Sequence, residues 1–125
     1  MKENRISYDV RGAIYKVYNE LGPGLLESVY ETALIYELRK LGYTVQNQVG
    51  IPMHYRSIRF DVGFRMDILV DNCVVIEVKS VDSLLDIHHK QLLTYLKLTG
   101  KRLGILVNFN TMSINNNIVR IVNNL

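Results

Sequence analysis

Two acidic residues and a lysine near the middle of the chain could together perform phosphoryl chemistry. Asp67 is followed ten residues later by the triplet Glu77-Val78-Lys79. Neighbouring carboxylates repel each other unless a cation lies between them, and Mg²⁺ takes oxygen ligands from one or two carboxylates plus water. The backbone carbonyl of Val78 could add an oxygen ligand, and such a cation can activate water and neutralise charge on a phosphate oxygen. Lys79 could orient that water or stabilise the phosphorus centre as a point charge.

The pattern of apolar residues predicts how these side chains are arranged. Between Phe64 and Lys79 the odd positions are mixed or charged, whereas the even positions are apolar. Because alternate residues of a strand face opposite sides of a sheet, two strands that share one apolar face are predicted. The apolar set consists of Met66, Ile68, Val70, Val74, Ile76 and Val78.

The loop between these two strands sets their register. A two-residue loop would mix the apolar and charged faces, which burial opposes. A three-residue loop at 71–73 instead pairs Val70 with Val74 and Asp67 with Glu77, and its central asparagine or a neighbour could take the left-handed conformation that such loops need. The charged face predicted in this way consists of Arg65, Asp67, Glu77 and Lys79.

A second interpretation of the same residues needs no metal. Charged side chains on an exposed strand face form cross-strand ion pairs, each worth a fraction of a kcal/mol. An aspartate followed by Glu-x-Lys is a common arrangement, so this segment alone leaves both interpretations open.

Two further segments carry polar side chains at helical spacing. Glu27 lies in the first turn of a predicted helix and borders its apolar face, although an acid at this place is also favoured by the helix dipole. His88, Gln91 and Tyr95 follow each other at spacings of three and four residues on a later predicted helix. This streak is either the border of an amphipathic helix or a group of side chains that hydrogen-bond a phosphate or a metal-bound water.

Taken in order, these motifs resemble the GxxExxY protein family of the PD-(D/E)XK nuclease superfamily. The motifs are Gly24-x-x-Glu27-x-x-Tyr30, Asp67, Glu77-Val78-Lys79 and Gln91-x-x-x-Tyr95. The likeness runs from about Ser7 to Val122 and is similar to the RecB-like branch, in which a helical glutamate precedes the core and a Gln-x-x-x-Tyr helix follows it. One departure is that Asp67 follows Met66 rather than the proline of the superfamily's name.

The resemblance implies an αβββαβ core, a divalent metal and phosphodiester hydrolysis. By position, it implies that Asp67 and Glu77 are metal ligands and that Lys79 is the catalytic base or the group that orients water. It also makes Glu27 an accessory acid. The residues that would steady the active site or the substrate are Gln91 and Tyr95.

Helices are predicted before and after this central segment. The first begins after Ser7 as N-cap and ends at Gly22-Pro23-Gly24. The second runs from about Leu26 to Leu41, with Gly42 at the left-handed C′ position. The third runs from about Leu84 to Leu98, with Ser83 as N-cap, Asp86 at the capping-box position and Gly100 at its end.

The remaining segments predict strands. Odd positions from Tyr43 to Ile51 are mostly apolar, which favours a strand interrupted at Asn47, and Pro52 places the next segment at an edge or a bend. The continuous apolar run 103–107 is typical of a buried strand parallel to 73–79. Asn115-Asn116-Asn117 predicts a turn, and 118–122 a final strand. We therefore expect one domain over residues 1–125. Together with these elements, the resemblance implies an α/β fold with a restriction-endonuclease-like αβββαβ core, a mixed central sheet flanked by helices and an extra N-terminal helix.

Composition narrows the class of protein. The 125 residues are 48% hydrophobic and 22% charged, typical of a globular domain, and a net charge of +3 is mildly favourable for a polyanionic partner. No apolar run is long enough for a bilayer, and Met1 to Arg5 lead into no apolar segment, so neither a membrane span nor a secretion signal is expected. A single cysteine, Cys73, excludes an internal disulfide and fits a reducing cytoplasm.

Two classes of function remain. The first is a nuclease, dependent on Mg²⁺ or Mn²⁺, that hydrolyses nucleic acid, with DNA as the expected substrate. The alternative is a nuclease-like fold without catalysis that serves as a binding or dimerisation module. So small a domain has no obvious DNA-recognition appendage, which favours a partner subunit or a second copy. The absence of a Gly-x-x-x-x-Gly-Lys-Ser/Thr sequence argues against a phosphate-binding nucleotide loop and a nucleotide cofactor.

Overall fold

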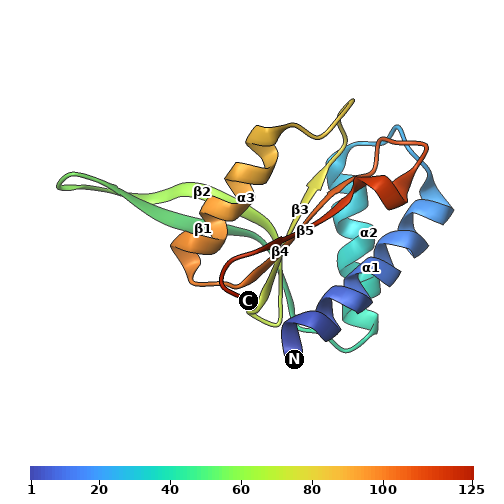
Figure 1. The fold of residues 1–125 in the computed structure, drawn as a ribbon, viewed down its shortest axis with the longest axis horizontal. Helices are drawn as coiled ribbons and strands as arrows, with labels where there is room; N and C mark the ends of the chain where they lie inside the picture. Colours follow the sequence, from blue (N-terminus) through green and yellow to red (C-terminus); the bar gives the residue numbers. More distant parts are fainter.

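A mixed five-stranded sheet in the order β1-β2-β3-β4-β5 forms the centre of the molecule (Figure 1). The structure is a computed structural model that describes all residues, 1–125. In chain order the elements are α1 (Lys2–Leu21), α2 (Glu27–Lys40), β1 (Val45–Tyr55), β2 (Ile58–Val70), β3 (Val74–Lys79), α3 (Asp86–Thr99), β4 (Leu103–Asn108), the short 3₁₀ helix η1 (Ile114–Asn117) and β5 (Ile118–Val122). The predicted αβββαβ core, the mixed sheet and the extra N-terminal helix are confirmed.

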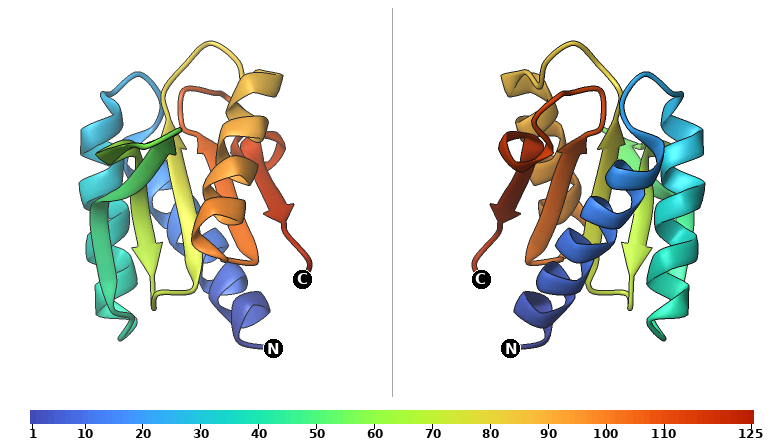
Figure 2. Two further views of the ribbon diagram at one scale, coloured as in Figure 1. Left: turned by 90° about the vertical axis from the view of Figure 1, so that its left-hand side faces the viewer. Right: turned by 90° about the vertical axis from the view of Figure 1, so that its right-hand side faces the viewer.

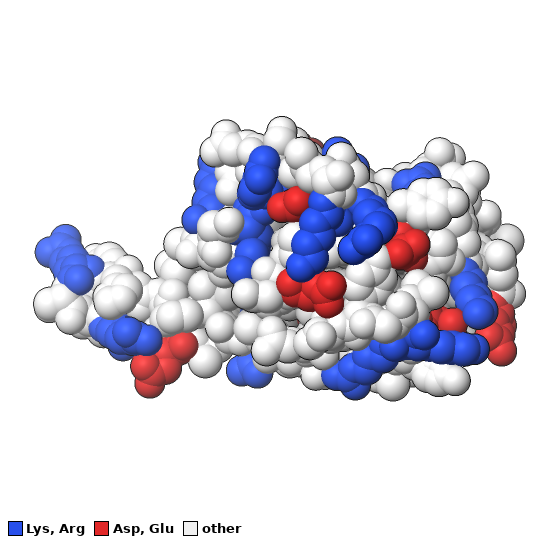
Figure 3. All heavy atoms as spheres, turned by 90° about the horizontal axis from the view of Figure 1, so that it is seen from below, with Lys and Arg blue, Asp and Glu red and all other residues white.

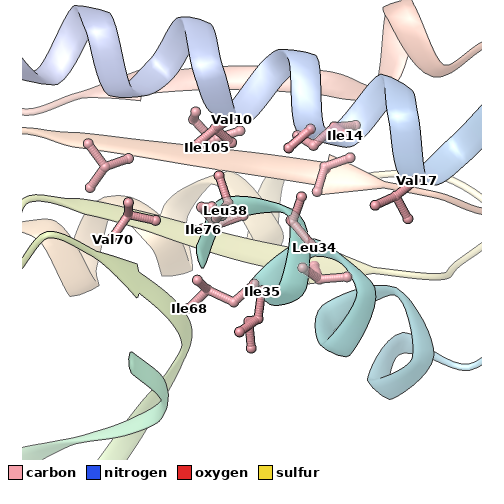
Figure 4. Packing of buried hydrophobic residues seen from close by; sticks show 14 of the residues in the cluster. Val10, Ile14, Val17, Leu34, Ile35, Leu38, Ile68, Val70, Ile76 and Ile105 are labelled. Carbon is pink, nitrogen blue, oxygen red and sulfur yellow. The ribbon is translucent and has the colours of Figure 1, made fainter. Parts of the chain in front are cut away.

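The helices cover both faces of the sheet (Figure 2). On one face, α1 and α2 pack on a large apolar cluster that includes Ile14, Leu34, Ile76 and Ile105 (Figure 4). On the other face, α3 packs on a smaller cluster around Leu92. Because β4 lies between the two layers, all six of its residues are buried, as its continuous apolar sequence predicts.

Strand register agrees with the sequence where the alternation is regular. Val70 pairs with Val74, so the predicted three-residue loop is correct, and Asp71 and Asn72 in that loop have left-handed φ angles of 50° and 52°. β3 and β4 are parallel, as the predicted crossover requires. The expected final strand is present as β5, and η1 forms at the predicted turn.

Two predicted helix starts are wrong. α1 begins at Lys2, before Ser7, because Ile6 is fully buried and extends the apolar stripe toward the N-terminus. α3 begins at Asp86 with Leu85 as its N-cap residue, so Ser83 and Leu84 precede the helix. The cap comes from inside the helix, since the Leu85 amide N–H donates to Nδ1 of His88 at 3.0 Å.

β1 and β2 are longer than the sequence indicated. β1 continues through Asn47, where an interruption was expected, and β2 begins at Ile58. β1 is an edge strand with a register shift between Ile51 and Met53, which agrees with the expected edge or bend at Pro52. Beyond the shift the two strands extend past the helices as a protruding ribbon (Figure 1).

The predicted single apolar face breaks at Met66. Ile68, Val70 and the even residues of β3 pack toward α1 and α2, whereas Met66 packs with Leu69 on the side of α3. The β2–β3 ladder ends at the pair Ile68↔Ile76, so β2 is free to turn its faces beyond that point. None of the helices combines the length and the hydropathy that a bilayer crossing requires.

Candidate active site

The candidate site lies where β2 and β3 separate. One residue beyond the last ladder pair, the Asp67 amide N–H donates to Oε1 of Glu77 at 3.4 Å. In return, the Val78 amide N–H donates to Oδ2 of Asp67 at 2.9 Å. Side-chain oxygens thus replace the main-chain carbonyls of a regular ladder, and two carboxylates from different strands lie side by side.

Glu77 is buried rather than exposed. Its side chain belongs to a residue that is 4% exposed, and burial, followed by the hydrogen bond and the negative charge of Asp67, raises its pKa to about 9. The interpretation as an exposed, ion-paired strand face is therefore wrong. The molecule holds two ion pairs, Lys16–Glu37 and Arg59–Asp61, and neither lies at this site.

Lys79 is the basic residue whose positive charge acts on Glu77. It ends β3, half-buried, two residues from Glu77 and so on the same side of the strand. Its charge opposes the rise in the pKa of Glu77 and, after burial, is the next cause that lowers the pKa of His88. The lysine therefore lies within electrostatic reach of both side chains, without an ion pair to Glu77.

Arg65 does not join this group. It was expected on the same face as Asp67, but it is exposed and no hydrogen bond or ion pair links it to the acidic pair. The reason is the same turn in β2 that moves Met66 to the other side of the sheet.

α3 brings Tyr95 near the acidic pair, and Gln91 lies one turn earlier on the same face of the helix. Tyr95 is 4% exposed; burial, then the charges of Glu77 and Asp67, raise its pKa to about 12, while a hydrogen bond with Gln91 acts in the opposite direction. Its ring also packs on Phe64, with centroids 5.3 Å apart. The phenol therefore stays protonated at neutral pH beside the two carboxylates.

α2 brings acids to the site from the other side. Glu27 is exposed in the first turn, and its charge acts on Glu31 and on His88. The tyrosine of the first motif, Tyr30, is buried, stacks on Phe109 with centroids 4.4 Å apart and donates from its hydroxyl to the Gly22 carbonyl at 2.6 Å. It thereby fixes the loop before Glu27.

Two site residues were not found from the sequence. Gln48 of β1 donates from Nε2 to Oε1 of Glu31 at 2.8 Å and to Oδ1 of Asp67 at 3.4 Å. Burial raises the pKa of Glu31, and the Gln48 bond acts against that rise. Glu31 follows Glu27 by four residues and so shares its helix face, which is a usable signal. No sequence pattern marks Gln48, because its contacts depend on a left-handed backbone conformation with φ of 52°.

The loop after β3 is tied down on both sides. Asn108, 1% exposed at the end of β4, accepts from the Val81 amide N–H and donates to the Val81 carbonyl, both at 3.0 Å. Ser80 donates from Oγ to the Leu25 carbonyl at 2.7 Å. The loops that follow α1 and β3 consequently lie together at one end of the molecule (Figure 2).

The donor set fits a hard cation. Asp67 and Glu77 are paired oxygen donors whose mutual repulsion a dication would relieve. No group of three histidine, cysteine, aspartate or glutamate side chains forms a complete cage, so main-chain oxygen and water must complete the coordination, as is usual for Mg²⁺. One hollow of about 550 Å³ is lined by α1, α2 and Leu41, and another of about 610 Å³ is lined by α2 and Asn47 of β1. Neither is lined by Asp67 or Glu77.

Comparison with known proteins agrees with this geometry. A family model described as the PD-(D/E)XK nuclease superfamily matches residues 4–121. The chain therefore belongs to the PD-(D/E)XK nuclease superfamily, whose nucleases are generally dependent on divalent metals. Searches of curated proteins and of solved structures found no significant match.

Proposed function

We propose that this protein hydrolyses phosphodiester bonds in nucleic acid, with DNA as the substrate and Mg²⁺ or Mn²⁺ as the metal. The observation that carries the proposal is the convergence of Asp67 and Glu77 from two strands, with Lys79 beside them. Membership of the PD-(D/E)XK nuclease superfamily supports the reaction class.

Asp67, Glu77 and the Val78 carbonyl would hold the metal. When bound there, a divalent cation would supply a Lewis acid for the scissile phosphate and favour deprotonation of the attacking water. Glu77 is buried beside Asp67, which makes the ionised pair unfavourable without a cation. A bound cation would therefore stabilise this pair more than it would stabilise exposed carboxylates. The hydrogen bond that the Val78 amide N–H donates to Asp67 holds one carboxylate in place.

The other residues act on water and substrate. Lys79 orients the attacking water and places positive charge near the phosphorus centre. Tyr95, protonated at neutral pH, and Gln91 donate hydrogen bonds at the acidic pair or to the phosphate. Glu27 lies exposed at the site as an accessory acid, and its charge and that of Lys79 both act on the pKa of His88.

We also propose the finer classification as a GxxExxY protein of the RecB-like branch. It is supported by a helix before the core that carries Glu27 and by a helix after it that carries Gln91 and Tyr95. Both sets of side chains act electrostatically or through hydrogen bonds on the same site. The alternative of a module without catalysis is separated from this proposal by the experiment below.

Cleavage by a lysine variant tests the proposal. Wild-type protein should cut plasmid or single-stranded DNA only when Mg²⁺ or Mn²⁺ is added. Lys79→Ala should keep its circular dichroism spectrum and lose cleavage by about 100-fold or more, the usual effect of removing a group that stabilises transition-state charge. Lys97→Ala, an exposed lysine in the last turn of α3, is the matched control and should cut normally.

Metal titration separates the enzyme from a binding module. Calorimetry should detect Mn²⁺ binding to the wild type and its loss in Asp67→Asn. Equal cleavage by Lys79→Ala and wild type would refute the role of the lysine, and a wild type that binds no metal would refute the hydrolase.

A further inference from the structure

A protruding β-ribbon is the most unusual surface feature of the molecule. The hairpin arm, residues 52–63, is the part of β1 and β2 that extends past the body (Figure 1). Every residue of the arm is exposed except Met53, which is partly buried. Its large apolar side chains Tyr55, Ile58, Phe60 and Val62 are 48–60% exposed. Apolar exposure of this extent marks a surface that contacts a partner.

The charge of the arm indicates which class of partner it fits. The arm carries Arg56 and Arg59 with one acid, Asp61, and Arg65 follows at its base. The Arg56 guanidinium lies 5.5 Å from the centre of the Tyr55 ring, and Arg59 pairs with Asp61 at 3.5 Å. Basic side chains are visible toward the end of the arm in Figure 3, on its left. The net positive charge is complementary to a phosphate backbone rather than to a second copy of the same basic arm.

The arm is continuous with the strand that carries the site. Ile58, near the tip, and Asp67 belong to the same strand, β2, so at about 3.3 Å per residue the tip lies roughly 30 Å along the strand from the acidic pair. That reach is close to one helical turn of duplex DNA, about 34 Å. A two-stranded β-ribbon is also one of the elements that the major groove admits.

We propose that the hairpin arm binds a nucleic-acid duplex beside the bond that is cut. Arg56 and Arg59 contact phosphates on the duplex, and the apolar face of Ile58 and Phe60 packs into the groove. The substrate class is therefore double-stranded, which deepens the proposed function and rests on it. The arm anchors the duplex while the acidic pair at the base of the ribbon faces a single phosphodiester.

Binding without cleavage tests this inference. Fluorescence anisotropy in EDTA measures affinity for a short labelled duplex and for its single strand, over a range of salt concentrations. The charge-reversal variant Arg56→Glu/Arg59→Glu should bind the duplex about tenfold or more weakly, and the slope of log K against log salt should fall by about 2, since each phosphate contact contributes about 0.9. The matched control is Lys2→Glu/Arg5→Glu, the same charge change on exposed residues at the start of α1. It should change affinity less than about twofold.

A second variant addresses the apolar residues. Ile58→Ser/Phe60→Ser should also weaken duplex binding while light scattering gives an unchanged mass. Equal weakening by both charge-reversal pairs, no weakening by the arm variants, or single-strand binding as tight as duplex binding would overturn the inference. So would a dimeric wild type that Ile58→Ser/Phe60→Ser converts to monomer with duplex affinity intact, because the arm would then be a self-association element.

Failure of the arm and failure of the hydrolase give different results. Duplex binding that depends on the arm, in a protein that never cleaves, would sustain the arm and refute the hydrolase. Metal-dependent cleavage that persists in Arg56→Glu/Arg59→Glu, with the duplex affinity unchanged, would sustain the hydrolase and refute the role of the arm.

Discussion

Gln48 connects three segments of the chain at one side chain. It lies on β1, donates to Glu31 of α2 and to Asp67 of β2, and occupies a left-handed backbone conformation that a β-strand rarely contains. The pairs on either side of it, Asn47↔Ile68 and Val49↔Met66, are formed. The irregularity is therefore local, and it aims the amide at the two carboxylates. Backbone strain of this kind persists only where the surrounding structure holds it in place.

Gln48→Leu should reduce activity without unfolding the protein. The variant removes a hydrogen bond that holds Asp67 and leaves Glu31 without its amide donor, so the pKa of Glu31 should rise further. Loss of one positioning hydrogen bond to a charged group corresponds to about 1.5–3 kcal/mol, or roughly a ten- to 100-fold lower kcat/KM. Gln46→Leu, an exposed glutamine two residues earlier on the same strand, is the matched control. Similar cleavage rates for the two variants would exclude a positioning role for Gln48.

At the residue scale, the sequence predicted that the two central acids lie together, but not the side chains of Gln48 and Glu31 beside them. Asp67 and Glu77 could be placed together because strict alternation and one loop length determine which residues oppose each other. Gln48 and Glu31 could not, because a left-handed residue in a strand and a contact between a helix and an edge strand leave no periodic signal. The contribution of each residue to catalysis stays a prediction.

At the scale of elements, the end of β4 holds the loop that follows β3. The Asn108 side chain pairs with both main-chain groups of Val81, and the Phe109 amide donates to the Lys79 carbonyl at 2.9 Å. The direction in which Lys79 leaves β3 is thus set by the neighbouring strand. A buried amide that satisfies two backbone groups is costly to remove, since both groups would then lack partners.

Asn108→Leu should destabilise the fold by about 1–3 kcal/mol, the cost of leaving buried polar groups unpaired. The variant should unfold at lower urea concentration with an unchanged m-value, because the surface exposed on unfolding stays the same. Asn115→Leu replaces an exposed asparagine of η1 and should change stability by less than about 0.5 kcal/mol. If Asn108→Leu were as stable as Asn115→Leu, the Val81 groups would have to find other partners, and Asn108 would not hold the loop after β3.

The elements themselves were largely predictable, and the errors have local causes. Helix ends marked by Gly22 and Gly100 were found because their positive φ angles suit glycine. The start of α3 was misplaced because His88, rather than a preceding serine, caps it. The arm was missed because alternation fails across the register shift near Pro52, and its apolar residues have no core to face.

At the scale of the whole molecule, the site is assembled from both layers and the middle of the sheet. α2 and α3 lie on opposite faces, yet each sends side chains to the point where β2 and β3 part. A buried acid at such a junction destabilises the folded chain when it is ionised, and the charge of Lys79 offsets only part of this effect, since the pKa of Glu77 is still raised to about 9. Ionisation of Glu77 therefore lowers the free energy of unfolding, and a bound cation should restore it.

This coupling predicts how stability depends on pH and on metal. The pKa of Glu77 is raised to about 9 from an ordinary 4.5, so between these values the folded chain holds a proton that the unfolded chain has lost. The contribution of Glu77 to stability is therefore complete below pH 4.5 and declines as pH rises toward 9, by up to about 1.4 kcal/mol per pH unit. Glu31, whose pKa is also raised, acts with the same sign. Excess Mg²⁺ should flatten this decline, because it favours the ionised pair.

Thermal or urea unfolding between about pH 6.5 and about 8.5 measures the effect. The lowered pKa of His88 acts with the opposite sign at the lower end of this range, because the unfolded chain then binds more protons at this residue, and its effect fades above the ordinary value of 6.5. Glu77→Gln should be more stable than wild type at the upper pH without metal, should show a shallower decline, and should gain nothing from Mg²⁺. Glu20→Gln, an exposed acid of α1, should behave as wild type does in both conditions. A wild type whose stability rises with pH over this range, or one that Mg²⁺ leaves unchanged while Glu77→Gln responds, would contradict the placement of the cation at Glu77.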